Sequence, residues 1–87
     1  MPTVFIPPPL RSLTGDVQQL ALEAGTVREV VRQLEARFPG VQSRLQQGDE
    51  LRPGLNVSVD GRVSSLGLYQ KVQSGSEIHF IPAIGGG

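Results

Sequence analysis

The residues that could do chemistry in this sequence gather at its C-terminal end. The chain ends in three glycines, Gly85, Gly86 and Gly87, and it contains no cysteine. Side-chain thiol chemistry, disulfides and cysteine-based metal sites are therefore excluded. A segment without side chains can lie extended in a channel too narrow for a Cβ atom and deliver its carboxylate into a partner's active site. We take the Gly87 carboxylate as the candidate reacting group, and a frayed chain end as the alternative interpretation of these glycines.

The sequence offers few other reactive groups. His79 is the single histidine, and it alternates with Ile78 and Phe80, which favours a solvent-facing position on a strand over a catalytic role. The glycines precede no helix and carry no lysine, as a phosphate loop would, and metal-ligand spacing is absent. We therefore expect no bound metal or cofactor. Activation of Gly87 by ATP would give an acyl-adenylate that a nucleophile can capture.

Composition narrows the class of protein. With 87 residues, 38% of them apolar and 18% charged, the chain fits one ordinary globular domain. Eight basic side chains balance eight acidic ones and form no run, which argues against a nucleic-acid or membrane-surface partner. A membrane span needs about 18 consecutive apolar residues, and no apolar run approaches this length. No signal peptide is recognisable. We expect a cytoplasmic protein.

A helix is the most clearly predicted element. The motif Thr-Val-Arg-Glu at 26–29 is a capping box, in which Thr26 accepts from the third helical amide and Glu29 reaches back. An apolar stripe follows at helical spacing, and Pro39-Gly40 ends it. The stripe consists of Val27, Val30, Val31, Leu34 and Phe38.

Strands are predicted on both sides of this helix. Residues 3–6 form a β-branched and aromatic strand that the prolines at 7–9 end, and a second strand carries Leu20 and Leu22 on one face. After the helix, residues 41–45 predict a second short helix, and residues 46–54 a surface loop.

The second half of the chain predicts another hairpin and a last strand. Residues 55–59 alternate apolar and polar side chains, and Asp60-Gly61 is a two-residue hairpin turn into a return strand at 62–63. Residues 66–72 predict an irregular segment or a short turn of helix. The last strand, 77–82, places Ile78 and Phe80 on one face and His79 and Ile81 on the other.

This order of elements predicts an α+β fold of the β-grasp (ubiquitin-like) type. A mixed four- to five-stranded sheet would carry one main helix on one face, with the first and last strands parallel neighbours. We expect a β-grasp domain over residues 1–82 and a flexible, glycine-rich tail over 83–87.

The alternation of side chains between the two faces of the first and last strands also predicts a docking surface. If Val4, Ile6, Ile78 and Phe80 face the helix, then Phe5 and Ile81 form an apolar patch on the open face of the sheet. This patch leads directly into the tail. We expect the patch to bind partners, while the following residues enter the partner's active site. These residues are Pro82, Ala83, Ile84, Gly85, Gly86 and Gly87.

With these features in place, the chain resembles the MoaD/ThiS family of sulfur carriers, which are prokaryotic relatives of ubiquitin. The resemblance covers essentially the whole length. It rests on the opening VFIP at 4–7, the helix start TV at 26–27 and the turn SGSE at 74–77. The most specific part is the terminal strand, IHFIPAIGGG at 78–87, which ends in Gly-Gly.

The resemblance implies a mechanism in which the chain is a co-substrate and the catalytic groups lie on its partners. An E1-like enzyme would adenylate the Gly87 carboxylate with ATP. Sulfur from a persulfide or sulfide would then replace AMP and leave a thiocarboxylate, which donates its sulfur to a downstream enzyme.

Several pathways are compatible with this mechanism. Residues 81–84, Ile-Pro-Ala-Ile, are most similar to carriers that supply cysteine synthase and related enzymes. The small subunit of molybdopterin synthase, which works with the large subunit in molybdenum cofactor biosynthesis, is the alternative. Carriers for thiazole synthesis rank third, because they usually lack a segment like 41–53. A hypothesis of another class is a ubiquitin-like interaction module or protein modifier without sulfur transfer.

Overall fold

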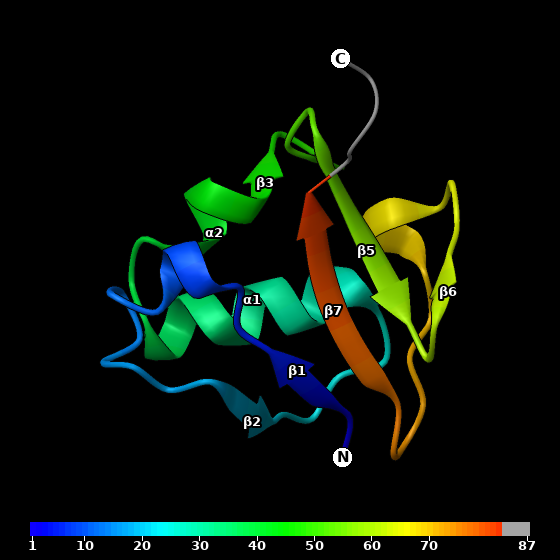
Figure 1. Cartoon of the computed structure of the whole chain (residues 1–87). Helices are drawn as coiled ribbons and strands as arrows, with labels where there is room; N and C mark the ends of the chain where they lie inside the picture. Colours follow the sequence, from blue (N-terminus) through cyan, green and yellow to red (C-terminus); the bar gives the residue numbers. More distant parts are fainter. Residues whose placement is uncertain (83–87) are drawn as a thin grey trace.

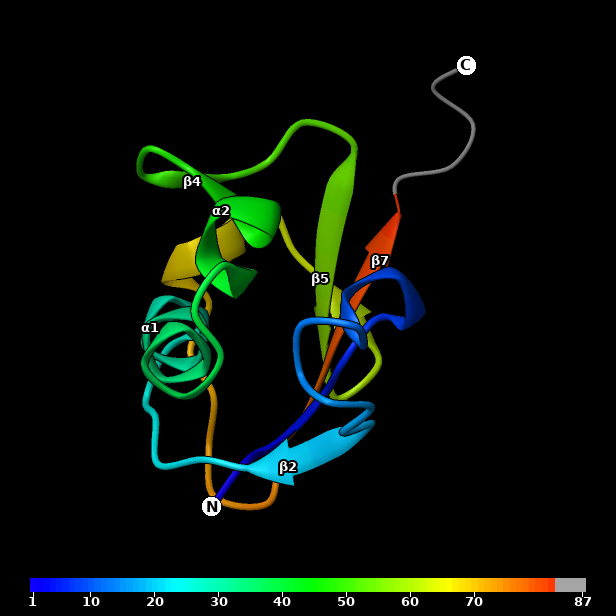
Figure 2. The ribbon, with the colours of Figure 1, turned by 90° about the vertical axis from the view of Figure 1, so that its left-hand side faces the viewer.

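In the computed structural model, which describes residues 1–82, a mixed sheet and a helix form two layers (Figures 1 and 2). Helix α1 (Val27–Arg37) crosses one face of the sheet, and the other face is open, as the view at right angles shows. The predicted arrangement of one main helix on one face of a mixed sheet is confirmed.

The sheet has five strands in the order β2-β1-β7-β5-β6. The strand β7 (Glu77–Pro82) lies at the centre, parallel to β1 (Thr3–Phe5) and antiparallel to β5 (Leu55–Val59). The outer strands are β2 (Gln19–Ala21) and β6 (Arg62–Val63), each antiparallel to its neighbour. The first and last strands are parallel neighbours, as predicted.

Helix α1 begins where the sequence predicts. Thr26 is its N-cap, with its side chain 3.2 Å from the Glu29 amide nitrogen that donates to it. Glu29 also reaches back, but its carboxylate accepts from the Gly25 N–H at 2.8 Å, one residue before the cap. Both hydrogen bonds satisfy amides at a helix start that would otherwise lack partners.

A carboxylate on α1 fixes the short helix α2 (Val41–Leu45). Glu35 accepts hydrogen bonds from the Gly40 N–H at 3.1 Å and from the Gln42 N–H at 2.8 Å. Gly40 has a φ of 103°, a backbone conformation that side chains disfavour, and this allows the sharp turn between the two helices. The second helix was correctly predicted.

The segment predicted as a surface loop contains paired strands. Strand β3 (Gln46–Gln47) pairs antiparallel with β4 (Glu50–Leu51), and Gly48 turns between them with a φ of 63°. The loop prediction over 46–54 was therefore wrong in part. Strands of two residues are too short to show the alternation by which a strand is recognised in sequence.

Two short 3-10 helices complete the fold. The first, η1 (Pro8–Leu10), follows β1 directly, where the sequence predicted only the end of a strand. Proline fits the first turn of a helix because it has a suitable fixed φ and no N–H to leave unpaired. The second, η2 (Gly67–Tyr69), is the predicted short helical turn.

One hydrophobic core lies between the sheet and the helices. The strand residues predicted to face α1 are all buried: Val4, Ile6, Ile78 and Phe80 expose 5% or less of their surface. The helical stripe meets them, and Val27, Val30, Val31 and Leu34 expose at most 1%. Alternation along β1 and β7 therefore determines which side chains point away from the core, onto the open face.

Candidate docking site

The chain leaves the sheet at Pro82, the last residue of the central strand β7. The predicted reacting group, the Gly87 carboxylate, and its neighbours Ala83, Ile84, Gly85 and Gly86 lie outside the described residues 1–82. The structure therefore describes the surface around the root of the tail. Of the predicted site residues, it places Phe5, Ile81 and Pro82.

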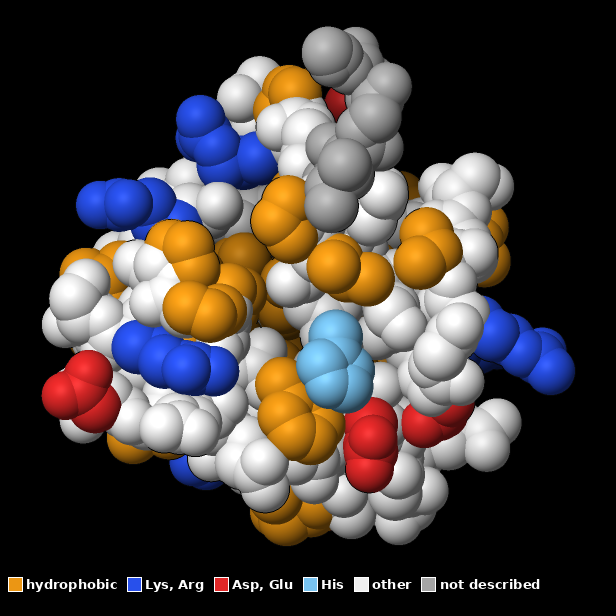
Figure 3. All heavy atoms as spheres, viewed as in Figure 1, with side chains coloured by type: hydrophobic (Ala, Val, Ile, Leu, Met, Phe, Trp, Pro, Cys, Tyr) orange, Lys and Arg blue, Asp and Glu red, His pale blue; other side chains and the backbone are white. Residues whose placement is uncertain are grey.

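Phe5 and Ile81 lie on the open face of the sheet, as predicted. Phe5 is half-buried, and Ile81 exposes 39% of its surface. Between them along the sheet lies His79, the register partner of Phe5 across the parallel β1–β7 pair. In Figure 3, which views this face, apolar side chains lie above and to the lower left of the imidazole, and acidic side chains lie below it.

The rings of Phe5 and His79 are stacked. Their centroids are 4.2 Å apart, and their planes deviate from parallel by 5°. The sequence analysis correctly predicted a solvent-facing His79 but missed this contact. The register of the two strands, which is not visible in either strand alone, brings the two rings together.

A fourth residue extends this surface toward the sheet edge. Val63 on β6 exposes 55% of its surface and pairs with Ser58, which in turn pairs with His79. Phe5, His79 and Ile81 on β1 and β7 thus share the open face with Val63 on β6, which lies beyond Ser58 of the intervening strand β5. We call these four residues the sheet patch.

A set of hydrogen bonds fixes the start of β7 and hence the sheet patch. The Asp60 carboxylate accepts from the Glu77 N–H and from the Ser76 hydroxyl, each at 2.9 Å. The Asp60 N–H donates to the Glu77 carbonyl, also at 2.9 Å, and the Gln73 N–H donates to the Ser76 hydroxyl. The hydrogen bond from the Glu77 backbone, together with that from Ser76, lowers the pKa of Asp60.

These contacts also explain the hairpin turn. Asp60 has a φ of 53° and Gly61 a φ of 82°, the pair of positive values that a tight two-residue hairpin turn requires. The sequence predicted the turn from Asp-Gly. It gave no signal that the Asp60 side chain also holds the β5–β6 hairpin against the first residue of β7.

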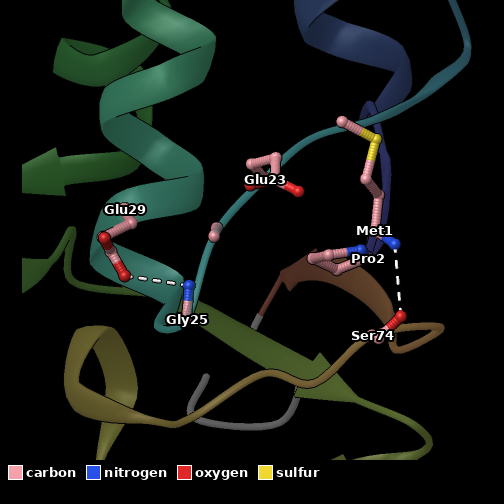
Figure 4. A pocket seen from close by; sticks show the side chains of 7 residues that line it. Met1, Pro2, Glu23, Gly25, Glu29 and Ser74 are labelled. Atoms are coloured by element: carbon pink, nitrogen blue, oxygen red, sulfur yellow. Dashed lines mark hydrogen bonds between the residues drawn. The ribbon is translucent and has the colours of Figure 1, made fainter.

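The open cleft in Figure 4 lies away from the root of the tail. It has a volume of about 410 Å³ and is lined by Met1, Pro2, Glu23, Gly25, Glu29 and Ser74, among others. The Met1 amine donates to the Ser74 hydroxyl at 3.3 Å across it. Because β1 and β7 are parallel, this cleft lies where both strands begin, whereas the tail starts where β7 ends.

The described part of the chain contains no cluster of metal-ligating side chains and no helix that could span a membrane. Among residues 1–82, no group of three or more histidine, aspartate or glutamate side chains is arranged to hold a metal ion. Within the same residues, every helix is too short or too polar to cross a membrane.

The fold and the exposed face together define a ubiquitin-like β-grasp protein. A chain in the crystal structure of the Amycolatopsis orientalis BexX/CysO complex superimposes with a TM-score of 0.88 over 100% of both chains, at 32% identity. The Mycobacterium tuberculosis sulfur carrier protein CysO is 33% identical over 98% of this chain and 97% of its own length. The small archaeal modifier protein 3 of Haloferax volcanii is 34% identical over 71% of this chain and 70% of its own.

The sequence matches the ThiS family over residues 4–87, and the chain belongs to this family. It is a sulfur carrier similar to CysO, a co-substrate rather than an enzyme, as the sequence analysis predicted. The matched range extends over the terminal glycines.

Proposed function

We propose that this protein carries sulfur as a thiocarboxylate on Gly87 and delivers it to an enzyme of cysteine synthesis or a related pathway. The observation that supports this proposal most strongly is the similarity to CysO over nearly the whole length of both chains. A match restricted to the fold would support only a ubiquitin-like architecture, because one fold hosts many functions.

The chemistry begins with activation of a poor electrophile. The Gly87 carboxylate attacks the α-phosphate of ATP in an E1-like enzyme, which forms an acyl-adenylate and releases pyrophosphate. A persulfide or sulfide then attacks the acyl carbon, and AMP leaves with its electron pair. When a persulfide is the donor, the product is an acyl disulfide; a thiol then attacks the donor's sulfur, a new disulfide forms, and Gly87 leaves as a thiocarboxylate. No side chain of the carrier takes part, which agrees with a chain that contains no cysteine.

Delivery uses the nucleophilic character of the thiocarboxylate. Its sulfur attacks an electrophilic carbon held by the acceptor enzyme, and later hydrolysis of the acyl–sulfur bond returns Gly87 to the carboxylate. The carrier is then ready for another round. ATP is consumed by the activating enzyme and is not a resident cofactor of the carrier. We place this cycle in the cytoplasm, where ATP is available.

The sheet patch is the proposed docking surface for these enzymes. Residues 83–87 span at most about 17 Å when extended, so an enzyme that holds Gly87 in its active site must approach Pro82 closely. His79 and Ile81 lie on β7, the strand that ends at Pro82, and Phe5 lies beside His79 on the parallel strand β1. Exposed apolar and aromatic side chains are the residues that typically supply binding energy at interfaces.

Similarity to the archaeal modifier protein favours a second candidate function, conjugation of Gly87 to proteins. The two functions share the adenylate and differ in the nucleophile that attacks it. A sulfide gives a thiocarboxylate, whereas a lysine amine gives an isopeptide bond. Products of the two reactions therefore distinguish the functions directly. Molybdopterin synthesis remains an alternative destination for the sulfur.

The test is intact-mass spectrometry of the carrier incubated with its host's E1-like enzyme, ATP and a sulfur donor. We expect the mass increase that replacement of one oxygen by sulfur produces, confined to the C-terminal peptide. A variant that lacks Gly86 and Gly87 is the matched control and should remain unmodified. An unchanged wild-type mass, with an enzyme that modifies a known carrier, would overturn the proposal.

A further inference from the structure

A small apolar groove lies beside the root of the tail. It has a volume of about 200 Å³ and forms where η1, the end of α2 and the ends of β5 and β7 meet. Leu55 and Pro82, which are register partners, line its sheet side. Pro82, the last residue of β7 before the tail, therefore lines the groove. The groove is also lined by Pro8, Pro9, Arg44 and Leu45.

The lining is apolar with one exception. Arg44 contributes a guanidinium at the surface, and the only ion pair within residues 1–82 joins Arg28 and Asp49, so Arg44 has no acidic partner among them. A second guanidinium lies along the same short helix, because Arg52 donates from its side chain to the Ser43 carbonyl at 3.2 Å. Arg52 does not line the groove, which thus combines an apolar floor with the single guanidinium of Arg44 at its rim.

The size of the groove indicates the kind of ligand. Pockets for small molecules usually occupy about 300–1,000 Å³, so a groove of this volume fits a single protein side chain better than a metabolite. Its prolines restrict the backbone before binding, which reduces the entropy lost when a partner docks. The Arg44 guanidinium at the rim, which has no acidic partner within residues 1–82, complements a carboxylate.

We propose that this groove binds a surface segment of the activating enzyme that carries one large apolar side chain next to a carboxylate. The proposal rests on the proposed function, since the activating enzyme is the partner that the unmodified chain meets first. That enzyme must approach Pro82 to hold Gly87, and Pro82 lines the groove. The apolar side chain fills the groove, and the carboxylate pairs with Arg44.

The test compares carrier variants as substrates of the host's E1-like enzyme in ATP–pyrophosphate exchange. For Arg44→Glu we expect KM for the carrier to rise at least about tenfold with kcat unchanged, because the lost contact lies away from the reacting carboxylate. The increase should shrink at high salt. Pro9→Asp should raise KM as well, since it places a charge in the apolar lining.

Arg32→Glu is the matched control, because Arg32 is exposed on α1 and does not line the groove. It should leave KM within about twofold of the wild-type value. Thermal unfolding of each variant, followed by circular dichroism, shows whether the fold is retained, which we expect for substitutions of exposed residues.

The other outcomes separate failure of the proposed function from failure of the groove assignment. A wild-type chain that the enzyme does not activate would overturn the proposed function itself. Normal activation of Arg44→Glu, or a defect confined to the sulfur-acceptor enzyme, would overturn the assignment of the groove and leave the carrier function intact. A concentration-dependent dimer that Arg44→Glu abolishes would identify a second copy of the chain as the ligand, and would also overturn it.

Discussion

The imidazole of His79 lies flat against the phenyl ring of Phe5, with ring centroids 4.2 Å apart and planes within 5° of parallel. The two residues are register partners on the parallel strands β1 and β7, so the backbone holds both rings in place. Stacked rings have less rotational freedom than isolated ones and lose less entropy when a partner covers them. This pair forms the aromatic part of the sheet patch.

The first prediction concerns Phe5→Asp. A charge at this position would remain unpaired beneath a docked partner, so we expect affinity for the activating enzyme to fall at least about tenfold. The free energy of unfolding should fall by only about 1 kcal/mol, the contribution of one stacked pair, because Phe5 lies outside the core. Calorimetric titration and urea unfolding measure the two effects separately.

Gln19→Asp provides the matched control for this variant. Gln19 is the exposed register partner of Phe5 on β2, on the other side of β1 from His79. The Gln19→Asp variant adds the same charge nearby without removing an aromatic ring. We therefore expect a smaller loss of affinity for the activating enzyme than Phe5→Asp causes. Global unfolding of Phe5→Asp would contradict the assignment of Phe5 to the open face.

The second prediction concerns Asp60 and pH. The Glu77 N–H and the Ser76 hydroxyl stabilise the ionised carboxylate and lower the pKa of Asp60 in the folded chain. Its contribution to stability is therefore complete above the unfolded-state pKa of about 3.9 and is lost as pH falls through the lower, folded-state value. We expect the wild type to lose stability below about pH 4 through this group.

Asp60→Asn removes this titration but keeps the size of the side chain. The variant should be less stable than the wild type at neutral pH, and the difference between the two should narrow as the solution is acidified. Urea unfolding at a series of pH values measures both curves. Parallel curves across the acidic range would show that Asp60 does not stabilise the fold through its charge.

The third prediction concerns the start of α1. Thr26→Ala removes the acceptor for the Glu29 N–H and should destabilise the fold by about 1 kcal/mol, the usual effect of losing an N-cap side chain. The control is Ser65→Ala, a substitution of an exposed residue, which should change stability by less than about 0.5 kcal/mol. Chemical denaturation of both variants measures the difference.

Much of the fold could be predicted because the informative signals are local. The capping residue Thr26 and the apolar stripe of α1 lie within a few turns, and the Asp60-Gly61 turn is recognisable from two residues. Because successive side chains of a strand point to opposite faces, the sequence of β7 alone assigned Ile78 and Phe80 to the core side of the sheet and their neighbours to the open face.

The features that sequence analysis missed depend on contacts between distant segments. The Phe5–His79 stack requires the register of two strands at opposite ends of the chain, and the Asp60 hydrogen bonds require β7 to lie against a hairpin turn. The groove beside Arg44 forms only when four separate segments meet. Three consecutive prolines at 7–9 were a possible signal for it, but proline runs usually mark only the end of a strand.

The last prediction concerns the glycines themselves. If the tail enters a channel in the activating enzyme that is too narrow for a Cβ atom, Gly86→Ala should reduce adenylation of Gly87 at least about a hundredfold, because a small displacement of the carboxylate is enough to prevent reaction. Stability should be unchanged, since the core of the fold consists of residues between 4 and 80. Gly85→Ala is the matched control. This position lies one residue farther from the reacting carboxylate, so we expect a much smaller loss of adenylation. Equal activity of both variants in pyrophosphate exchange would show that the glycines serve some purpose other than passage through a narrow channel.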